Sequence, residues 1–190
     1  MKHVLVLFTL LVPQMAPAQS NTAEEGLAAW DRIYQVTSSP RCANCHVGDN
    51  NIPMWSGPSY GSTRPHGMYI DAGPSRIGAE FIPCSTCHVS SDRPNLTPHS
   101  APHIAGLWHL APVEAEWFGK SSNDICTQLR DLERNGGRTA EDLVDHAAED
   151  AIVAWGWTPG GTRVPAPFSQ AEHVTDMRIW GAAGQPCPGD

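Results

Sequence analysis

The sequence predicts a mainly α-helical fold with long irregular loops. Several segments start with a helix-capping signal and continue with apolar residues at helical spacing. No stretch shows the sustained alternation of apolar and polar residues that is typical of a half-buried strand. Glycine and proline each occur 17 times in 190 residues, and they are dense in residues 48–83 and 89–120. We therefore expect helices near the start and in the last third of the chain, with irregular backbone between them.

The first helix is predicted by the capping box of residues 22–25. Leu27 and Trp30 follow at helical spacing, and the helix should run to about Thr37. Pro40 then places a stop directly before the first cysteine of the middle region.

Three further helices are expected in the last third of the chain. A helix capped at Ser122 or Asn123 should end at the Asn-Gly-Gly turn of 135–137. A second should cover about 139–150, and a third opens with the capping box of 169–172.

A pentapeptide of the pattern Cys-x-x-Cys-His occurs twice, at residues 42–46 and 84–88. Two thiols three positions apart reach the two vinyl groups on one edge of a porphyrin and form thioethers, and the adjacent imidazole ligates the iron. The sequence therefore predicts two covalently attached haems c. Their thioether cysteines would be Cys42, Cys45, Cys84 and Cys87, and their proximal iron ligands would be His46 and His88.

These motifs refine the expected fold to a dihaem cytochrome c domain built around two covalently attached haems. The helices offer each other little apolar surface for a loop-rich domain of this size. Two buried porphyrins would supply large apolar faces that the helices lack. We accordingly expect the protein without its haems to be poorly folded.

The first 18 residues have the pattern of a cleaved secretory signal. Lys2 precedes an apolar run of about nine residues, and Ala-Pro-Ala at 16–18 forms a small-x-small cleavage site. The apolar run is too short to stay as a membrane anchor, and no later segment is long and apolar enough to span a bilayer. The sequence thus predicts a signal peptide at 1–18, a single domain at 19–190 and a periplasmic location. This agrees with the haem prediction, because c-type haems are attached outside the cytoplasm.

The chain is acidic, with 12 basic and 20 acidic residues and a net charge of −8 when histidines are neutral. Removal of residues 1–18, which contain Lys2 and no acid, changes the net charge to −9. This charge argues against binding to nucleic acid or to anionic membranes. It favours a redox partner, donor or acceptor, that presents a basic docking face, although plain solubility is an equal explanation.

Two cysteines, Cys126 and Cys187, lie outside the motifs. In an oxidising compartment a leftover pair most often forms a disulfide. Closing a loop of about 60 residues would stabilise the fold by roughly 4 kcal/mol on the chain-entropy model. Thiol redox chemistry is the alternative, but neither residue belongs to a Cys-x-x-Cys pair.

The distal ligand of each iron decides what a haem protein does, because an imidazole or thioether closes the site and an empty position admits substrate. The best candidates are His66, in a flexible segment between the motifs, and His146, on a predicted helix beside apolar residues. The alternative is that both are surface residues without a ligand role. The remaining candidates are His109, His173, the weaker His99 and His103, and Met177. Met177 would supply a thioether, although core packing beside Trp180 is the favoured role for it.

Residues 40–92 resemble the small dihaem cytochrome subunit of periplasmic nitrate reductase, which has two such motifs similarly spaced with a histidine between them. The resemblance gives His66 the bridging role of that histidine. That family takes its other distal histidine from upstream of the first motif, and residues 19–45 contain none. The second distal ligand, if it is a histidine, has to come from downstream.

Most of residues 40–188 resemble small bacterial c-type cytochromes labelled as isoquinoline 1-oxidoreductase subunits. Segments at 117–129, 135–137 and 154–160, together with the Cys187-Pro188 ending, carry this resemblance. The label implies electron delivery from a molybdenum hydroxylase, and it names a family rather than an activity.

These features predict a periplasmic electron-transfer protein that passes single electrons through two haems to or from a redox partner. A periplasmic dehydrogenase or a molybdenum hydroxylase is a candidate partner, and no side chain is required for catalysis. One alternative is a small dihaem enzyme, either a peroxidase or a sulfur-compound oxidoreductase. The other is a haem-bearing subunit of a molybdenum hydroxylase.

Overall fold

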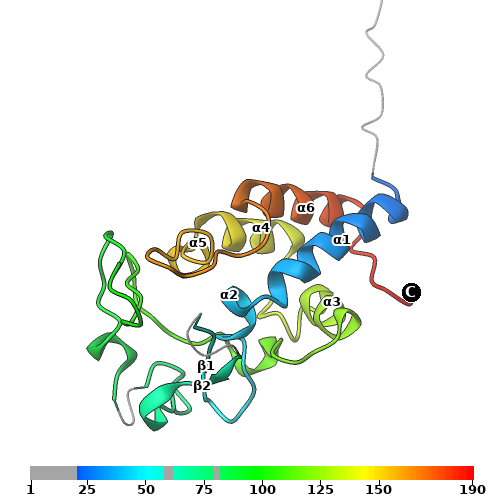
Figure 1. Cartoon of the computed structure of the whole chain (residues 1–190). Coiled ribbons are helices and arrows are strands. Elements are labelled where there is room, and N and C mark those ends of the chain that lie inside the picture. Colours follow the sequence, from blue (N-terminus) through cyan, green and yellow to red (C-terminus); the bar gives the residue numbers. More distant parts are fainter. Residues whose placement is uncertain (1–20, 58–61, 79–81) are drawn as a thin grey trace, which may run out of the picture.

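A computed structural model of the chain describes residues 21–57, 62–78 and 82–190. The described residues are mainly helical, as predicted, with one short pair of strands. The helices gather on one side of the molecule, and most of the irregular chain lies on the other (Figure 1). The predicted signal segment at 1–18 falls outside the described residues. Within those residues, no helix has both the length and the apolarity that a membrane crossing requires.

Four longer helices form what we call the helical region. Each begins with a capping box, in which the N-cap hydroxyl accepts the N–H of the third helical residue and that residue's carboxylate accepts the N-cap N–H. A cap of this kind stabilises a helix by about 1 kcal/mol. The helices are α1 (Ala23–Thr37), α3 (Ser122–Arg130), α4 (Ala140–Glu149) and α6 (Gln170–Ala182), with N-caps Thr22, Ser121, Thr139 and Ser169.

The helical region encloses the larger apolar core. Both α1 and α4 pack against α6, and Trp30 of α1 lies against Trp180 of α6 with ring centroids 5.2 Å apart. Both indoles are fully buried. Trp30 donates its N–H to the Ser122 hydroxyl and Trp180 donates to the Pro186 carbonyl. Burying an aromatic side chain with its polar atom satisfied adds roughly 2 kcal/mol or more to stability.

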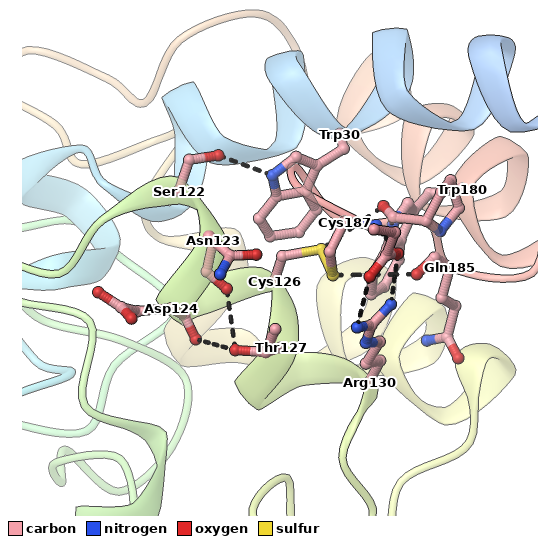
Figure 2. The surroundings of a disulfide bond; sticks show 12 residues. Trp30, Ser122, Asn123, Asp124, Cys126, Thr127, Arg130, Trp180, Gln185 and Cys187 are labelled. Atoms are coloured by element: carbon pink, nitrogen blue, oxygen red, sulfur yellow. Dashed lines mark hydrogen bonds and ion pairs between the residues drawn. A yellow bond between two sulfur atoms is a disulfide. The ribbon is translucent and has the colours of Figure 1, made fainter.

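The predicted disulfide is present and joins α3 to the C-terminal tail. Cys126 is bonded to Cys187, and both side chains are buried beside Trp30 (Figure 2). Close by, Arg130 donates two hydrogen bonds to the carboxylate of Asp190, at 2.6 and 2.8 Å. The tail is therefore fixed to α3 by a covalent bond and an ion pair.

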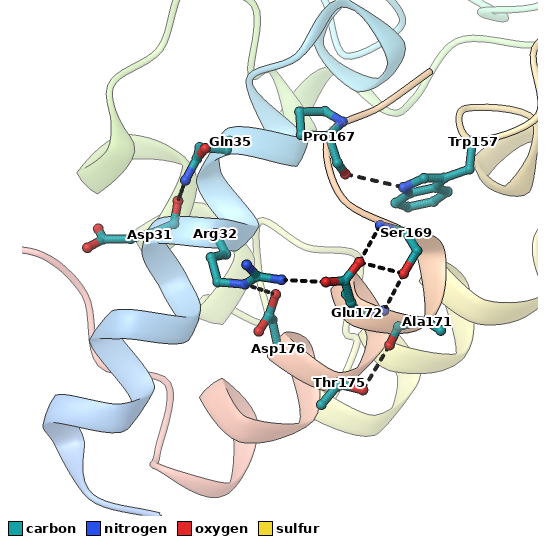
Figure 3. Close-up of polar contacts among 10 residues, drawn as sticks. All are labelled: Asp31, Arg32, Gln35, Trp157, Pro167, Ser169, Ala171, Glu172, Thr175 and Asp176. Atoms are coloured by element: carbon teal, nitrogen blue, oxygen red, sulfur yellow. Dashed lines mark hydrogen bonds and ion pairs between the residues drawn. The ribbon is translucent and has the colours of Figure 1, made fainter. Parts of the chain in front are cut away.

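A polar link also joins α1 to α6. Arg32 donates from Nε to Asp176 at 2.9 Å and from a terminal nitrogen to Glu172 at 3.4 Å (Figure 3). Its guanidinium lies 3.9 Å from the centre of the Phe168 ring. Because Arg32 and Glu172 are largely exposed, the pair orients the helices more than it stabilises them.

Residues 44–118 contain most of the irregular backbone, and we call them the loop region. Its strands β1 and β2 run antiparallel, with Met54 opposite Pro65 and Trp55 opposite Arg64. Its own buried apolar cluster is small and consists of Val47, Ala72 and Leu110. The short elements are β1 (Met54–Trp55), β2 (Arg64–Pro65) and the 3-10 turns η2 (Gly67–Tyr69), η3 (Cys84–Thr86) and η4 (Val113–Ala115). Two short helices lie outside the loop region, α2 (Pro40–Ala43) and α5 (Ala151–Ala154).

Arg76 holds three stretches of the loop region together. The residue is buried, and its φ of +67° lies in the left-handed region. Its guanidinium donates to the carbonyls of Val47, Gly48 and Ala111 at 2.7–2.8 Å, and to the Asn51 side chain at 3.0 Å. The stretch around Ala111 is thereby fixed next to the first motif.

Two expectations about the first half of the chain need correction. The irregular backbone predicted for 48–83 contains β1 and β2, which are two residues each and therefore too short to produce a visible alternation. The first helix ends at Thr37 as predicted, but Pro40 starts α2 instead of only closing α1. Proline fits the first helical position, where its missing N–H would have no partner anyway.

The boundaries of α3 also differ from the expectation. Its cap is Ser121, one residue before the predicted Ser122 or Asn123. The helix ends at Arg130 and not at 135–137, because Asp131 has extended backbone angles of φ −89° and ψ 109°. The helices predicted over 139–150 and after 169–172 are confirmed.

Candidate functional site

Two adjacent cavities are present, and each is lined by one Cys-x-x-Cys-His motif. Cavity 1, of about 330 Å³, contains both cysteines and the histidine of 42–46. Cavity 2, of about 350 Å³, contains those of 84–88. Both volumes fall within the roughly 300–1,000 Å³ that is typical of cofactor and ligand sites.

The first motif is positioned by α2. Cys42 lies within this helix, and the N–H of Cys45 donates to the Cys42 carbonyl at 3.1 Å, which continues the turn. The three-residue spacing therefore brings both thiols to cavity 1. Burial raises the pKa of Cys42 to about 12 and that of Cys45 to about 11, and both are protonated thiols at neutral pH. All four motif cysteines are free, unlike the pair in the disulfide.

The ring of His46 is fixed from two sides. Its Nδ1 donates to the Ala115 carbonyl at 2.8 Å. Because a carbonyl oxygen only accepts, the ring proton must be on Nδ1, and Nε2 keeps its lone pair. Trp117 stacks on the ring with centroids 3.5 Å apart and planes 7° apart, and its N–H donates to Gln128. Burial lowers the pKa of His46 to about 3, although the Ala115 carbonyl acts in the opposite direction. The imidazole is therefore neutral and oriented, as a metal ligand requires.

His88 of the second motif has the same surroundings. It follows η3, its Nδ1 donates to the Pro102 carbonyl at 3.1 Å, and Trp108 stacks on it at 4.5 Å with planes 11° apart. Burial lowers its pKa to about 4, against the effect of the Pro102 carbonyl. Two motifs from separate parts of the chain thus carry one arrangement, a carbonyl on Nδ1 and a tryptophan on the ring face.

His66, a predicted distal ligand, shares cavity 2 with His88. The two ring centroids are 6.2 Å apart and the planes differ by 56°. A metal–imidazole bond of about 2 Å, plus roughly 1 Å from that nitrogen to the ring centre, puts two imidazoles on opposite sides of one metal about 6 Å apart. His66 Nδ1 donates to the Gly67 carbonyl at 2.9 Å, which leaves its Nε2 lone pair free as well. Spacing and tautomers both fit an iron between the two rings.

The backbone that holds His66 is unusual. The His66 N–H donates to the Pro53 carbonyl at 2.8 Å, which fixes the start of the turn beside β1. Met68 and Tyr69 then have φ values of +62° and +56°, in the left-handed region that non-glycine residues rarely adopt. Such residues cost on the order of 1–3 kcal/mol each and cluster at functional sites. The turn that places His66 is therefore held by its surroundings against local strain.

Cavity 1 holds the candidates His146 and His109 in addition to His46. Nδ1 of His146, on α4, lies 3.4 Å from the carboxylate of Asp150. Burial lowers the pKa of His146, although Asp150 opposes this, and His146 in turn adds to the lowering of the His46 pKa. His109 donates from Nδ1 to the Leu110 carbonyl at 3.0 Å. Both rings can offer Nε2, and the preference for His146 stays a prediction from the sequence.

Helix α6 adds His173 and Met177 to the wall of cavity 1, and both are buried. His173 Nδ1 has no hydrogen-bond partner among the described residues, and burial lowers the pKa of His173 to about 4. An unpaired buried nitrogen is costly, which marks a place where a polar group of a ligand would fit. Of the weaker candidates, His99 lines cavity 2, whereas His103 lies 3.4 Å from the Asn95 amide instead.

The two cavities share a wall made of Arg41, Cys45, Trp108 and Trp155. Trp108 meets Trp155 edge to face, with centroids 5.1 Å apart and planes at 83°. Burial raises the pKa of Cys45 and Arg41 acts in the opposite direction, while Cys84 of the other motif adds a smaller increase. Single side chains therefore separate one cavity from the other.

The donor groups of both cavities suit a haem better than a bare metal ion. In the described part of the chain, no three His, Cys, Asp or Glu side chains are arranged to hold an ion by themselves. A porphyrin brings its own nitrogen ligands, and its iron needs protein ligands only on its two faces. Each cavity supplies two thiols, a neutral imidazole with a free Nε2, and a second imidazole. These are the residue types that a c-type haem requires.

Sequence reasoning identified the candidate ligands but missed the residues that surround them. Trp108 and Trp117 stack on the motif histidines, and Arg41 and Trp155 build the shared wall. One signal was available: the chain has seven tryptophans, and Trp55, Trp108 and Trp117 fall in segments predicted to be irregular.

The chain was compared with known protein families, curated proteins and solved structures, and no match was found in any of the three.

Proposed function

We propose that the protein is an exported electron carrier in which cavities 1 and 2 each hold one covalently attached haem c. When bound, each haem supplies an iron that takes up and releases a single electron. The observation that carries the proposal is the pair His66 and His88, two imidazoles in one cavity with centroids 6.2 Å apart. The matching environment of His46 extends the argument to cavity 1.

The cysteines would hold each haem through thioether bonds. An S–H adds across a vinyl C=C bond, so that the hydrogen and the sulfur both end on the former vinyl group and no oxidant is consumed. Cys42 and Cys45 serve cavity 1, and Cys84 and Cys87 serve cavity 2. The backbone carbonyls keep the proton of each motif imidazole on Nδ1, and the stacked tryptophans prevent the ring from turning.

A carrier is favoured over an enzyme because each cavity contains a second imidazole. His66 in cavity 2 and His146 in cavity 1 would close the second face of each iron, which leaves no position for a substrate. The shared wall supports a two-centre carrier, since only single side chains lie between the sites. The alternative of a small dihaem peroxidase or sulfur-compound oxidoreductase requires an open position.

Export and partner are inferred from the rest of the chain. The signal pattern at 1–18 and the disulfide both suit the periplasm. The net charge of −9 without residues 1–18 suits a redox partner with a basic docking face. A periplasmic dehydrogenase or a molybdenum hydroxylase is the partner class that the resemblances indicate.

Optical and electron paramagnetic resonance spectra of the purified protein test the proposal. We expect two low-spin, six-coordinate haems in the resting protein. A high-spin haem that binds cyanide would overturn the carrier and favour the enzyme. A protein without covalently attached haem after expression with the c-type maturation machinery would overturn both.

Single substitutions then test the ligands. His66→Ala and His146→Ala should each convert one of the two haems to a high-spin form, because one iron loses an axial imidazole. His103→Ala is the matched control, since His103 lies against Asn95, and it should leave both haems low-spin. If His109→Ala produces the high-spin form in place of His146→Ala, the assignment in cavity 1 is wrong.

A further inference from the structure

Arg41 is a cation in the shared wall with hydrogen-bond donors to spare. It lines both cavities, and its guanidinium lies 5.2 Å from the centre of the Trp155 ring. One terminal nitrogen donates to the Ser56 carbonyl at 3.3 Å, and no ion pair of Arg41 is found within the described ranges. Burial lowers the pKa of Arg41, which reflects a charge partly removed from water. A guanidinium in this position lacks a counter-charge.

The buried Arg76 and the partly buried Arg163 use their donors differently. Arg76 donates to the carbonyls of Val47, Gly48 and Ala111. Arg163 donates to several carbonyls, including those of Asn95 and Ser100. Each therefore ties stretches of backbone together, a role that Arg41 with its single long hydrogen bond does not have.

Trp155 presents a second unused donor at the same place. Its Nε1 is buried and has no hydrogen-bond partner in the described structure. Trp30, Trp117 and Trp180, by contrast, each donate to an oxygen at 2.8–2.9 Å. Leaving a buried N–H unpaired costs about 1–3 kcal/mol. A charged donor with a single long hydrogen bond and a neutral donor with none thus lie close together at the wall.

We propose that Arg41 and the indole N–H of Trp155 together bind a carboxylate, a propionate of the haem in cavity 2. The inference rests on the proposed function and adds a binding role for two residues outside the motifs. A carboxylate supplies both missing features, a negative charge for the guanidinium and an acceptor for the indole. Hydrogen bonds of this charge-assisted kind are about twice as strong as neutral ones.

The assignment to cavity 2 follows from the chemistry of the porphyrin. Its vinyl groups and its propionates are on opposite edges. Arg41 precedes Cys42 in the chain, and Cys42 and Cys45 both influence its pKa, although less than burial does. Arg41 is therefore beside the thioether edge of the haem in cavity 1, away from that haem's propionates. The carboxylate that it binds belongs to the haem in the neighbouring cavity, which Arg41 also lines.

The test measures the midpoint potentials of both haems and the carboxylate bands in redox-difference infrared spectra. Arg41→Gln should lower the equilibrium constant for reduction of the cavity 2 haem about tenfold, which is 59 mV for one electron, because removing a nearby cation destabilises the reduced state. Arg41→Lys should retain part of the effect, since a lysine keeps the charge but loses the planar fork. Trp155→Phe should shift the carboxylate band while the charge is unchanged. The cavity 2 haem is recognised as the one that His66→Ala makes high-spin.

Arg178→Gln is the matched control, because it removes one positive charge from the exposed face of α6, and it should change neither readout. Unchanged potentials and bands in Arg41→Gln and Trp155→Phe, with two haems still attached, would overturn this inference alone. A potential shift without a band shift, or a shift confined to the cavity 1 haem, would overturn it too. If the variants do not fold, the infrared spectrum of the unaltered holoprotein decides: replacing the Trp155 indole N–H by N–D should shift a propionate carboxylate band, and a band that is unchanged by this replacement would contradict the contact.

Discussion

The helical region and the loop region differ in what fills their interiors. The helical region has a continuous apolar core that includes Trp30, Ile33, Ile125 and Trp180, and it is closed by a disulfide. The buried cluster found among the described residues of the loop region is small, and many of these residues line the two cavities. The first region can therefore be stable through its own side chains, whereas the second depends on what occupies its cavities.

The two cavities stand in different relations to these regions. Cavity 1 lies between them, because its wall includes Leu129, Leu143 and Met177 from the helical core. Cavity 2 is lined almost entirely by the loop region, apart from wall residues such as Arg41 and Trp155. The expectation that the whole protein is poorly folded without haem can therefore be refined. Loss of the group in cavity 2 should loosen the loop region and leave the helices in place.

The largest structural change is expected from removing the attachment site of cavity 2, because the loop region should open. The variant Cys84→Ala/Cys87→Ala should lose about 2.7 kcal/mol of stability that the bound haem gives to the loop region. The fraction of molecules with an open loop region then rises roughly a hundredfold, and limited proteolysis between about residues 62 and 107 should be faster by the same factor. The helical circular dichroism signal should remain. Mapping the fragments by mass spectrometry checks the position of the cuts. Equal loss of the helical signal would mean that the two regions fold as one unit.

A smaller structural change is expected from opening the disulfide, because both regions should keep their native fold. Cys126→Ser/Cys187→Ser removes a cross-link between residues 61 positions apart, which should lower the free energy of unfolding of the helical region by about 4 kcal/mol. Denaturant titration followed by circular dichroism gives this value. The optical spectra of the haems should not change in the native protein. If the haem transition in denaturant shifts by the same amount as the helical one, the distinction between the two regions fails.

The smallest effect concerns acid stability and His173 in the helical core. At neutral pH the ring is neutral in both states. As the pH falls below the ordinary histidine pKa of about 6.5, the unfolded state takes up a proton, whereas burial holds the folded pKa at about 4. The wild-type protein should therefore lose on the order of 2 kcal/mol between pH 7 and pH 4 through this residue.

His173→Gln should show a correspondingly flatter dependence of stability on pH over that interval. Thermal unfolding at a series of pH values, followed at the helical circular dichroism band, measures it. His103→Gln serves as the control, because His103 lies in the loop region and should leave the acid sensitivity of the helices unchanged. An identical slope in wild type and His173→Gln would show that the buried ring does not contribute.

Local patterns predicted the secondary structure where the relevant contacts are local. The capping boxes at Thr22 and Ser169 were found from sequence because a cap joins residues three positions apart. The predicted end of α3 was wrong, because the helix stops where Asp131 adopts extended backbone angles and no glycine or proline marks that position in the sequence. The strand pair β1–β2 was missed because two-residue strands have no period.

The sequence by itself determined the chemistry of the two motifs, because a C-x-x-C-H run brings its thiols and imidazole together within one turn of backbone. It also narrowed the candidate distal ligands of the proposed haems to a few histidines and Met177. Tertiary structure decided which of them meet: His66 lies near His88 only because a strained turn after β2 brings it there. It decided equally that Arg41 and Trp155, far apart in the chain, form one wall. Such pairings depend on the path of whole loops, which Arg76 and the helical core fix together, and no local spacing encodes them.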